Sequence, residues 1–329
     1  MSVLRAAITR RVLGPVSFPQ YAAVGLHEPQ QHVEVVWVRA RGEPIDVTGN
    51  NVVTSLSPLT IGVMLGQDGR SGEPAGAPSR LEFRERQGAH RLLGAVHLRF
   101  VRDIALAPHV FRLFEACGCE NYCLPALTLR LYYAYERWRT ERQQRRNPHN
   151  FRMTHPDLRA LFVFYICPRP VMLVTVSHEG LSNIFPMDLI GPTDSRWYSM
   201  ALRATSPAVS LIQRSRCLAL GRAPLSYKAI AYELGKHHKQ TSVDWAALPF
   251  ETAPSPLFGL PVPTASLGVR EVRVEAFHQV GSHVLFVTSV ANDTAPAHAP
   301  GAANGLQLFH IHGAYRQHLL RNGIRLEEA

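Results

Sequence analysis

The sequence predicts a mainly β protein with helices. Residues 1–145 are expected to form a β-rich domain that ends in helices, and residues 150–329 an antiparallel β-barrel, closed or half closed. Two observations predict this class: β-branched and aromatic runs recur at strand length between turn residues, and a helical period occupies a stretch near the middle. With 329 residues, 46% of them hydrophobic, the chain can bury one large core or two ordinary ones.

The first region begins with strands. HVEVVWV (32–38) and NNVVTSLSPLTIGVML (50–65) are rich in β-branched residues, and LEFRERQGAHRLLGAVHLRFV (81–101) adds a third and a fourth strand. Residues 66–79 collect Gly, Pro, Ser and Asp, which predicts an exposed loop between them.

The hydrophobic period changes from about Ile104, and residues 109–147 predict two helices broken near Pro125. The segment 137–159 then carries seven Arg against two acidic residues, and its middle is interpreted as a linker. Basic runs also occur in nucleic-acid binders, but no interleaved aromatic platform accompanies this one. We therefore expect a solvated helix end and no nucleic-acid partner.

The second region contains five apolar runs of strand length. They are RALFVFYI (159–166), RPVMLVTVS (169–177), GLSNIFPMDLIG (180–191), RWYSMALRA (196–204) and RCLALGR (216–222). Two longer strands follow, VREVRVEAFHQV (269–280) and HVLFVTSVAND (283–293), and the tight turn between them predicts a hairpin. No internal repeat is evident in the sequence.

The chain is basic, with a formal net charge of +10, and all but three of its 35 basic residues are Arg. Such a surface attracts phosphate groups and anionic cofactors. Five unevenly placed cysteines do not form a secreted disulfide framework, which favours a cytoplasmic protein. The start lacks the pattern of a secretory signal, and no apolar run reaches the ~20 residues needed to cross a bilayer, so no membrane partner is expected.

One short stretch, RATSP (203–207), combines the features of an anion site. Ser206 is a favoured N-cap residue and Pro207 suits the first helical position, so a helix is expected to begin here. A helix N-terminus exposes backbone N–H groups and a partial positive charge. Arg203 and the Thr205 hydroxyl would add donors for a phosphate group. An ordinary capped helix beside a surface Arg is the alternative.

Residues 169–224 resemble the flavin-reductase-like family of FMN-binding split barrels. The resemblance rests on Arg169-Pro170 at a strand start, on Gly180, Asn183 and Pro186 in a Gly-x-x-Asn-x-x-Pro segment, and on a strand that ends in polar residues before a helix. Gly281-Ser282-His283 before VLFV is similar to the family's Gly-Asp-His turn, and FHIHGAYR (309–316) to its closing strand. Together these motifs cover roughly residues 155–320.

The resemblance implies a bound FMN with its isoalloxazine against residues 186–190 and its phosphate near residues 199–206. The cofactor-binding residues expected are Asn183, Pro186, Met187, Asp188, Leu189, Ile190, Ser199, Met200, Ala201, Leu202, Arg203, Thr205 and Ser206. His283 would serve the nicotinamide donor as the catalytic residue. Ser282 departs from the Asp of the family, which puts NADH or NADPH use in question more than flavin binding.

The function implied is an FMN-dependent oxidoreductase of flavin-reductase type, which passes a hydride from NADH or NADPH to bound flavin and on to a flavin or small-molecule acceptor. The resemblance further implies a homodimer. One alternative is an FMN-binding electron carrier or sensor without nicotinamide turnover. A haem-binding relative with His310 or His312 as ligand is the other.

Three other groups of residues leave their roles open. His310 and His312 share a strand face, but no third metal ligand is identifiable, so no metal is expected. The basic segment 236–239 attracts an anionic second substrate or is a solvated face. Cysteines 117, 119 and 123 are interpreted as buried free thiols on a helix in preference to a metal site.

Overall fold

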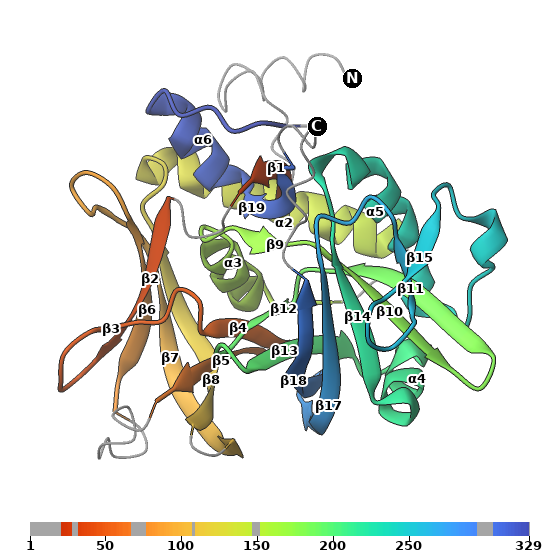
Figure 1. Cartoon of the computed structure of the whole chain (residues 1–329). Coiled ribbons are helices and arrows are strands. Elements are labelled where there is room, and N and C mark those ends of the chain that lie inside the picture. Colours follow the sequence, from red (N-terminus) through yellow and green to blue (C-terminus); the bar gives the residue numbers. More distant parts are fainter. Residues whose placement is uncertain are drawn as a thin grey trace, which may run out of the picture.

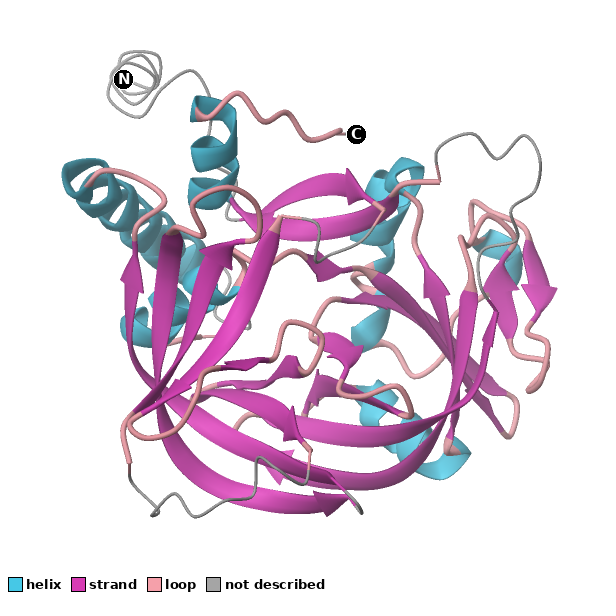
Figure 2. Ribbon diagram, turned by 60° about the vertical axis from the view of Figure 1, so that its left-hand side comes forward, coloured by secondary structure: helices cyan, strands magenta, loops and turns pink. Residues whose placement is uncertain are grey.

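The computed structural model describes residues 21–27, 32–66, 77–106, 109–146, 152–294 and 305–328. Two seven-stranded antiparallel sheets stand side by side in Figure 1, and a three-stranded sheet lies above and between them. Figure 2 shows that strands make up most of the molecule and that helices lie mainly at its periphery. The predicted mainly β class with helices is confirmed.

The first sheet has the strand order β3-β2-β6-β7-β8-β5-β4. Its strands are β2 (Val33–Arg39), β3 (Ile45–Asp46), β4 (Asn51–Leu56), β5 (Leu59–Leu65), β6 (Ser79–Glu85), β7 (Leu92–Leu106) and β8 (His109–Asn121). Ile45 and Val53 come from the two opposite edge strands yet pack in one hydrophobic core, so the sheet curls around that core.

The second sheet has the order β11-β10-β14-β17-β18-β13-β12. Its strands are β10 (Met172–His178), β11 (Leu181–Met187), β12 (Ile190–Pro192), β13 (Trp197–Arg203), β14 (Cys217–Arg222), β17 (Val269–Val280) and β18 (His283–Thr294). Phe185 and Ile190, again from opposite edges, share one core with helix α4 (Pro207–Ser215). This sheet is therefore a curled half-barrel that α4 plugs.

The second half also contains short helices and a two-stranded ribbon. They are η2 (Leu225–Tyr227), α5 (Lys228–Leu234), η3 (His237–Lys239), η4 (Trp245–Ala247) and the ribbon β15 (Thr252–Pro254) with β16 (Pro261–Pro263). Strand β10 carries α4 on one face, and η3 lies against β11 at the sheet edge. This edge is where the candidate site lies.

The third sheet joins distant parts of the chain in the order β1-β19-β9 (Tyr21–Leu26, Gln307–His312 and Arg169–Pro170). Helices α2 (Ala126–Arg146), α3 (His155–Phe164) and α6 (Gly313–Arg321) complete the fold. Both α3 and α6 pack in the core of the first sheet, so that core draws on residues from both predicted regions; the boundary near residue 150 stays a prediction. None of the described helices is long and apolar enough to cross a membrane.

The two large sheets are built alike, and the expectation of no internal repeat is wrong. Taken in chain order, their seven strands occupy the same positions in both sheets. The hairpins β7–β8 and β17–β18 match residue by residue: the pair His97–Gly118 corresponds to Glu271–Asn292, an offset of 174 residues in both strands. Each hairpin also has two register shifts, and these fall at the same offset. The chain therefore contains a structural duplication.

Two local predictions are wrong for one physical reason. Residues 109–121 are strand β8, not a helix, and 159–166 lie mostly in helix α3, not a strand. Phe114 faces the core of the first sheet while Phe111 and Leu113 face the layer between the sheets, so burial on both faces removes the strand's alternation. Residues 160–164 of helix α3 are all buried, which removes the helical period in the same way.

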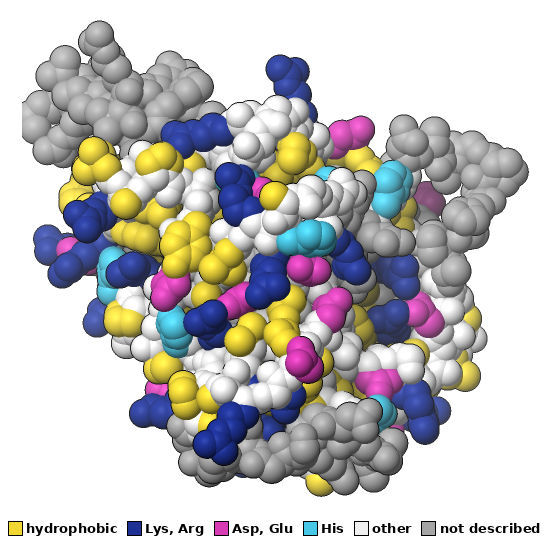
Figure 3. All heavy atoms as spheres, turned by 90° about the vertical axis from the view of Figure 1, so that its left-hand side faces the viewer, with side chains coloured by type: hydrophobic (Ala, Val, Ile, Leu, Met, Phe, Trp, Pro, Cys, Tyr) yellow, Lys and Arg dark blue, Asp and Glu magenta, His cyan; other side chains and the backbone are white. Residues whose placement is uncertain are grey.

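The remaining local predictions fare better. The strand at 32–38, the two strands in 81–101, the second predicted helix and the hairpin at residues 281–282 are confirmed. The single strand predicted at 50–65 is instead the antiparallel pair β4 and β5, which turns at Ser57-Pro58. Most of the predicted loop 66–79 and the middle of the predicted linker lie outside the described residues. On the outer face of the first sheet, Figure 3 shows basic side chains interspersed with acidic ones, and Arg99 pairs with Glu115 there at 2.8 Å.

Candidate functional site

Strand β13 runs directly into helix α4, as the sequence predicted. Ser206 is the N-cap residue in an extended conformation, and Pro207 opens the helix. The Ser206 side chain makes no capping bond; its hydroxyl donates instead to the carbonyl of His238. Thr205 is exposed and Arg203 half-buried beside it. The N-terminus of α4 thus keeps polar side chains around it while its own N-cap hydroxyl is directed elsewhere.

The basic segment of η3 is fixed against this helix start by Asn183. The Asn183 side-chain amide is fully buried and donates to the carbonyls of His237 (3.0 Å) and Gln240 (2.8 Å). The His237 ring donates from Nδ1 to the Ile184 carbonyl at 3.0 Å. Asn183, predicted as a cofactor contact, therefore positions the segment that faces the end of β13.

Arg203, Thr205, Ser206, His238 and Lys239 together form what we call the anion cluster. Partial burial, together with the charges of Lys239 and Arg203, lowers the pKa of His238. His238 is then neutral near pH 7 and offers a hydrogen bond, while Arg203 and Lys239 supply the positive charge. The helix dipole of α4 adds to that charge. The cluster has the donors and the sign of charge that a phosphate group requires.

His283 lies opposite Arg203 on the neighbouring strand β18, but the first half of the chain covers it. Its Nδ1 accepts from the Leu56 backbone N–H at 3.4 Å and lies 2.9 Å from the Ser282 hydroxyl. Burial and the nearby charge of Arg203 lower the pKa of His283 to about 4. His283 is thus a neutral, buried histidine at the junction of the two halves, and its contact with a nicotinamide stays a prediction.

A second polar cluster surrounds Asp188, between β11 and β12. Asp188 Oδ2 accepts a hydrogen bond from His310 Nδ1 at 2.8 Å, and His310 Nε2 lies 3.3 Å from the Tyr232 hydroxyl. The His310 ring stacks against both Tyr232 and Tyr21. Burial opposes ionisation of Asp188, but hydrogen bonds from His310 and Tyr165 outweigh it and lower its pKa. We call Asp188, His310 and Tyr232 the relay cluster.

Sequence reasoning missed the tyrosines that surround Asp188 and His310. Tyr21, Tyr165 and Tyr232 come from β1, the end of α3 and α5, and no motif links them. Tyr232 was visible only as an aromatic residue in a helix beside the basic segment 236–239. The structure brings them together because β1 pairs with β19, which carries His310.

The other predicted cofactor residues have little exposed surface. Pro186 and Leu189 are half-buried, whereas Met187 and Ile190 are part of the barrel core. Along β13, the side chains of Met200 and Leu202 also belong to that core. Ser199 and Ala201 lie on the opposite face, toward the first sheet. The Ser199 hydroxyl is buried without a hydrogen-bond partner among the described residues.

Neither histidine proposed as a haem ligand has an uncommitted nitrogen. His310 uses both nitrogens in the relay cluster. His312 Nδ1 accepts from the Ala314 backbone N–H at 3.3 Å, and its Nε2 then carries the proton toward the Tyr132 hydroxyl at 3.0 Å. These contacts give no support to the haem alternative.

Cys117 and Cys119 lie on strand β8, not on a helix, and Cys123 follows it. All three are free thiols, of which only Cys123 is buried. No group of three potential metal ligands occurs among the residues that the structure describes.

No family model and no curated protein matches the chain. Among solved structures, it is similar to an FMN-binding protein from Thermus thermophilus with bound p-hydroxybenzaldehyde at 21% identity and a TM-score of 0.40, over 49% of this chain and 90% of that one. An NADH:FAD oxidoreductase from Streptomyces globisporus matches at 13% identity and a TM-score of 0.40, over 51% and 90%.

Nitrilotriacetate monooxygenase component B from Mycobacterium thermoresistibile matches at 18% identity and a TM-score of 0.39, over 48% of this chain and 84% of that one. Over about half its length the chain therefore matches structures of flavin reductases and FMN-binding proteins, at identities that speak to the fold alone.

Proposed function

We propose that this protein is an FMN-dependent oxidoreductase of flavin-reductase type, which takes a hydride from NADH or NADPH and passes it through FMN to a flavin or another small acceptor. One observation carries the proposal. The end of β13, the N-terminus of α4 and the basic segment η3 converge in the anion cluster, beside a curled antiparallel sheet with the flavin-reductase-like motifs.

The residues present fit FMN at both of its ends. Arg203, the Thr205 hydroxyl and the first-turn backbone of α4 would hold the phosphate, with Lys239 adding charge. Half-buried Pro186 and Leu189 would offer apolar contact to the isoalloxazine, and Asp188 would lie at its polar edge. When bound, FMN would supply the hydride and electron transfer itself.

The relay cluster would handle the proton that accompanies reduction. Asp188 fixes His310 with Nδ1 as donor, so that the neutral ring presents Nε2 as an acceptor to the Tyr232 hydroxyl. Tyr232 is 52% exposed, whereas His310 is half-buried. The three side chains therefore connect bulk water to the segment 186–190 through two hydrogen bonds.

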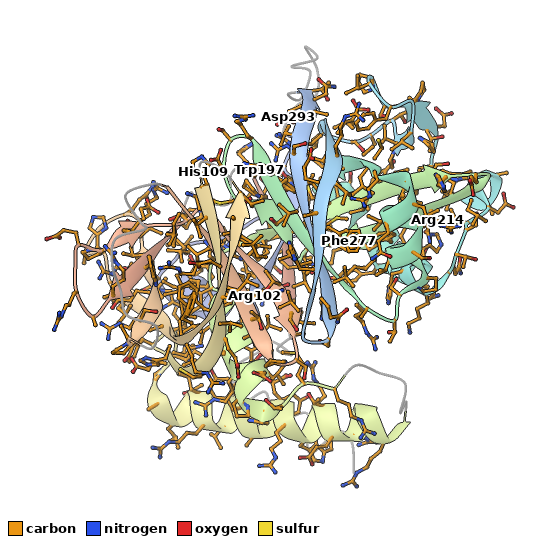
Figure 4. All side chains as sticks on the ribbon, turned by 90° about the horizontal axis from the view of Figure 1, so that it is seen from below. Arg102, His109, Trp197, Arg214, Phe277 and Asp293 are labelled. Carbon is orange, nitrogen blue, oxygen red and sulfur yellow. The ribbon has the colours of Figure 1, made fainter. Side chains whose placement is uncertain are left out.

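The first test is an FMN titration of the purified protein followed by absorbance, with NADH or NADPH added under anaerobic conditions. Arg203→Gln should weaken FMN binding about tenfold or more, because a charge-assisted hydrogen bond contributes roughly 1.5–3 kcal/mol. Arg214→Gln is the matched control: Arg214 is exposed on the same helix, away from the junction of the sheets in Figure 4, and should bind FMN as the parent does. Equal affinity for the two variants would remove the phosphate assignment.

One observation favours a second candidate, an FMN-binding electron carrier or sensor without nicotinamide turnover. Ser282 and His283 are engaged by the β4–β5 turn, since Ser282 Oγ accepts from the Ser57 backbone N–H at 3.1 Å. A turn held in this way is less available to a nicotinamide. Bound flavin that does not bleach with NADH or NADPH would support this candidate.

A further inference from the structure

We propose that the first half of this chain is a built-in partner of the second, so that the protein acts as a monomer with a single anion cluster. The homodimer implied by the sequence resemblance is untested by a single chain, and the internal pairing offers another arrangement. The monomer claim stands on the interface alone, whereas one flavin per chain rests on the proposed function.

The contacts between the halves are reciprocal, as in an interface between two identical subunits. His109 and His283 hold equivalent places at the start of β8 and of β18, at the offset of 174 residues. His109 Nε2 lies 2.9 Å from Asp194 Oδ2, in the turn between β12 and β13. His283 Nδ1 accepts from Leu56, next to the turn between β4 and β5. Each hairpin thus contacts the same turn of the other half, which defines an isologous contact.

The apolar layer between the sheets has the same symmetry. Its buried members include three equivalent pairs: Leu106 with Val280, Phe111 with Leu285, and Leu113 with Val287. Figure 4 shows His109 of the first sheet close to Trp197 of the second, which packs at the edge of this layer. A polar contact crosses it as well, from Arg102 to the Gln279 carbonyl at 3.3 Å. An interface that resembles a divided core is typical of obligate partners.

The two halves differ where the second half carries its anion cluster. Pairing with β8 and β18 makes Gly62 equivalent to Ser199 and Met64 equivalent to Ala201, so that Gly66 corresponds to Arg203. A Cβ on Gly62 would lie 2.1 Å from the ring of Phe111, which fills that place. Only Arg203 of these three belongs to the anion cluster, and its equivalent Gly66 has no side chain; on this difference we assign the chain one cluster and not two.

The mass in solution tests the first part of the proposal without flavin. Light scattering after gel filtration, over a hundredfold range of concentration, should give the chain mass of 36.6 kDa throughout. The midpoint of thermal unfolding should not move with protein concentration, because no second molecule dissociates. A mass near twice that value, or a midpoint that rises with concentration, would overturn the built-in partner.

The number of flavins tests the second part. Titration of the full chain with FMN should saturate at one equivalent per chain, and Arg203→Gln should weaken that single phase about tenfold or more. Saturation at two equivalents, or an FMN phase of unchanged affinity in Arg203→Gln, would overturn the single cluster. Absence of any FMN binding would refute the proposed function and the one-flavin claim, while the mass measurement still decides whether the chain is a monomer.

Discussion

Replacing Gly281 with Ala tests the docking of the two halves at one point. Gly281 has a φ of 50°, where an L residue costs roughly 1–2 kcal/mol. A Cβ there would lie 2.6 Å from both the Ser55 hydroxyl and the Ser57 carbonyl oxygen. That carbonyl also accepts a hydrogen bond from the Ser282 backbone at 2.9 Å, so it cannot retreat without breaking a contact between the halves. We expect the overpacking to add about 1–3 kcal/mol to the loss of stability.

Gly180→Ala supplies the matched control. Gly180 has a φ of 77° in the β10–β11 turn, and a Cβ there would meet nothing within 4 Å. Gly180→Ala should lower the free energy of unfolding only by the backbone cost of roughly 1–2 kcal/mol. Urea unfolding followed by circular dichroism gives both free energies of unfolding. Losses that agree within about 0.5 kcal/mol would refute the docking of this turn against β4 and β5.

Three further predictions concern the clusters and the buried histidines. Asp188→Asn should slow the NADH-dependent bleaching of FMN-saturated protein about 10²-fold, because the amide no longer holds His310 by charge. Stopped-flow absorbance measures this rate, and an unchanged rate would exclude the relay. Burial lowers the pKa of His283 to about 4 and that of His312 to about 3, below the ordinary 6.5, so the unfolded chain binds more protons. The free energy of unfolding should therefore keep its full value above about pH 6.5 and fall by about 1.4 kcal/mol per pH unit for each histidine below that pH. Urea unfolding at about pH 7 and about pH 5 measures this slope. His283→Gln should reduce the slope, and a free energy of unfolding that does not change with pH would contradict the prediction. Asn183→Ala should cost about 1–3 kcal/mol of stability and also weaken FMN binding, because the His237 and Gln240 carbonyls lose their donor and η3 is no longer held in place. A loss of stability with unchanged FMN affinity would show that η3 is not part of the FMN site.

Local chemistry explains what the sequence predicted well. Ser206 and Pro207 mark the start of α4, and the turn at Gly281 with its flanking alternation marks the longest hairpin of the second half. These signals lie within a few residues of the feature they predict. Strand β8 and helix α3 gave no such signal, because burial on all sides removed the period that distinguishes a strand from a helix.

The candidate site was only partly predictable. Arg203, Thr205 and Ser206 were predicted because one helix start gathers them, and Asp188 because it lies in the segment 186–190, against which the resemblance places the isoalloxazine. The partners that give Asp188 its chemistry, His310 and Tyr232, reach it through the pairing of β1 with β19 and the packing of α5. Contacts of that kind form only in the completed fold, so no characteristic spacing of residues in the sequence predicts them.

The duplication escaped the sequence for a related reason. Its signature is the order of strands and the position of two bulges, which are properties of backbone pairing. Equivalent buried positions keep only apolar character, as Phe111 and Leu285 do. Elsewhere the residue types differ outright, as at Gly62 and Ser199.

The pairing of β1 with β19 also sets the order in which the molecule can be completed. The strands of the first sheet leave the ribosome long before β19 and α6, yet Phe309, Tyr315 and Leu319 belong to their core. Figure 1 shows these last elements, in blue, lying over the earliest ones. Until β19 and α6 have been synthesised, the first half exposes the apolar surface that they cover in the folded chain. The core of the first sheet can therefore be completed only after β19 and α6 have been synthesised.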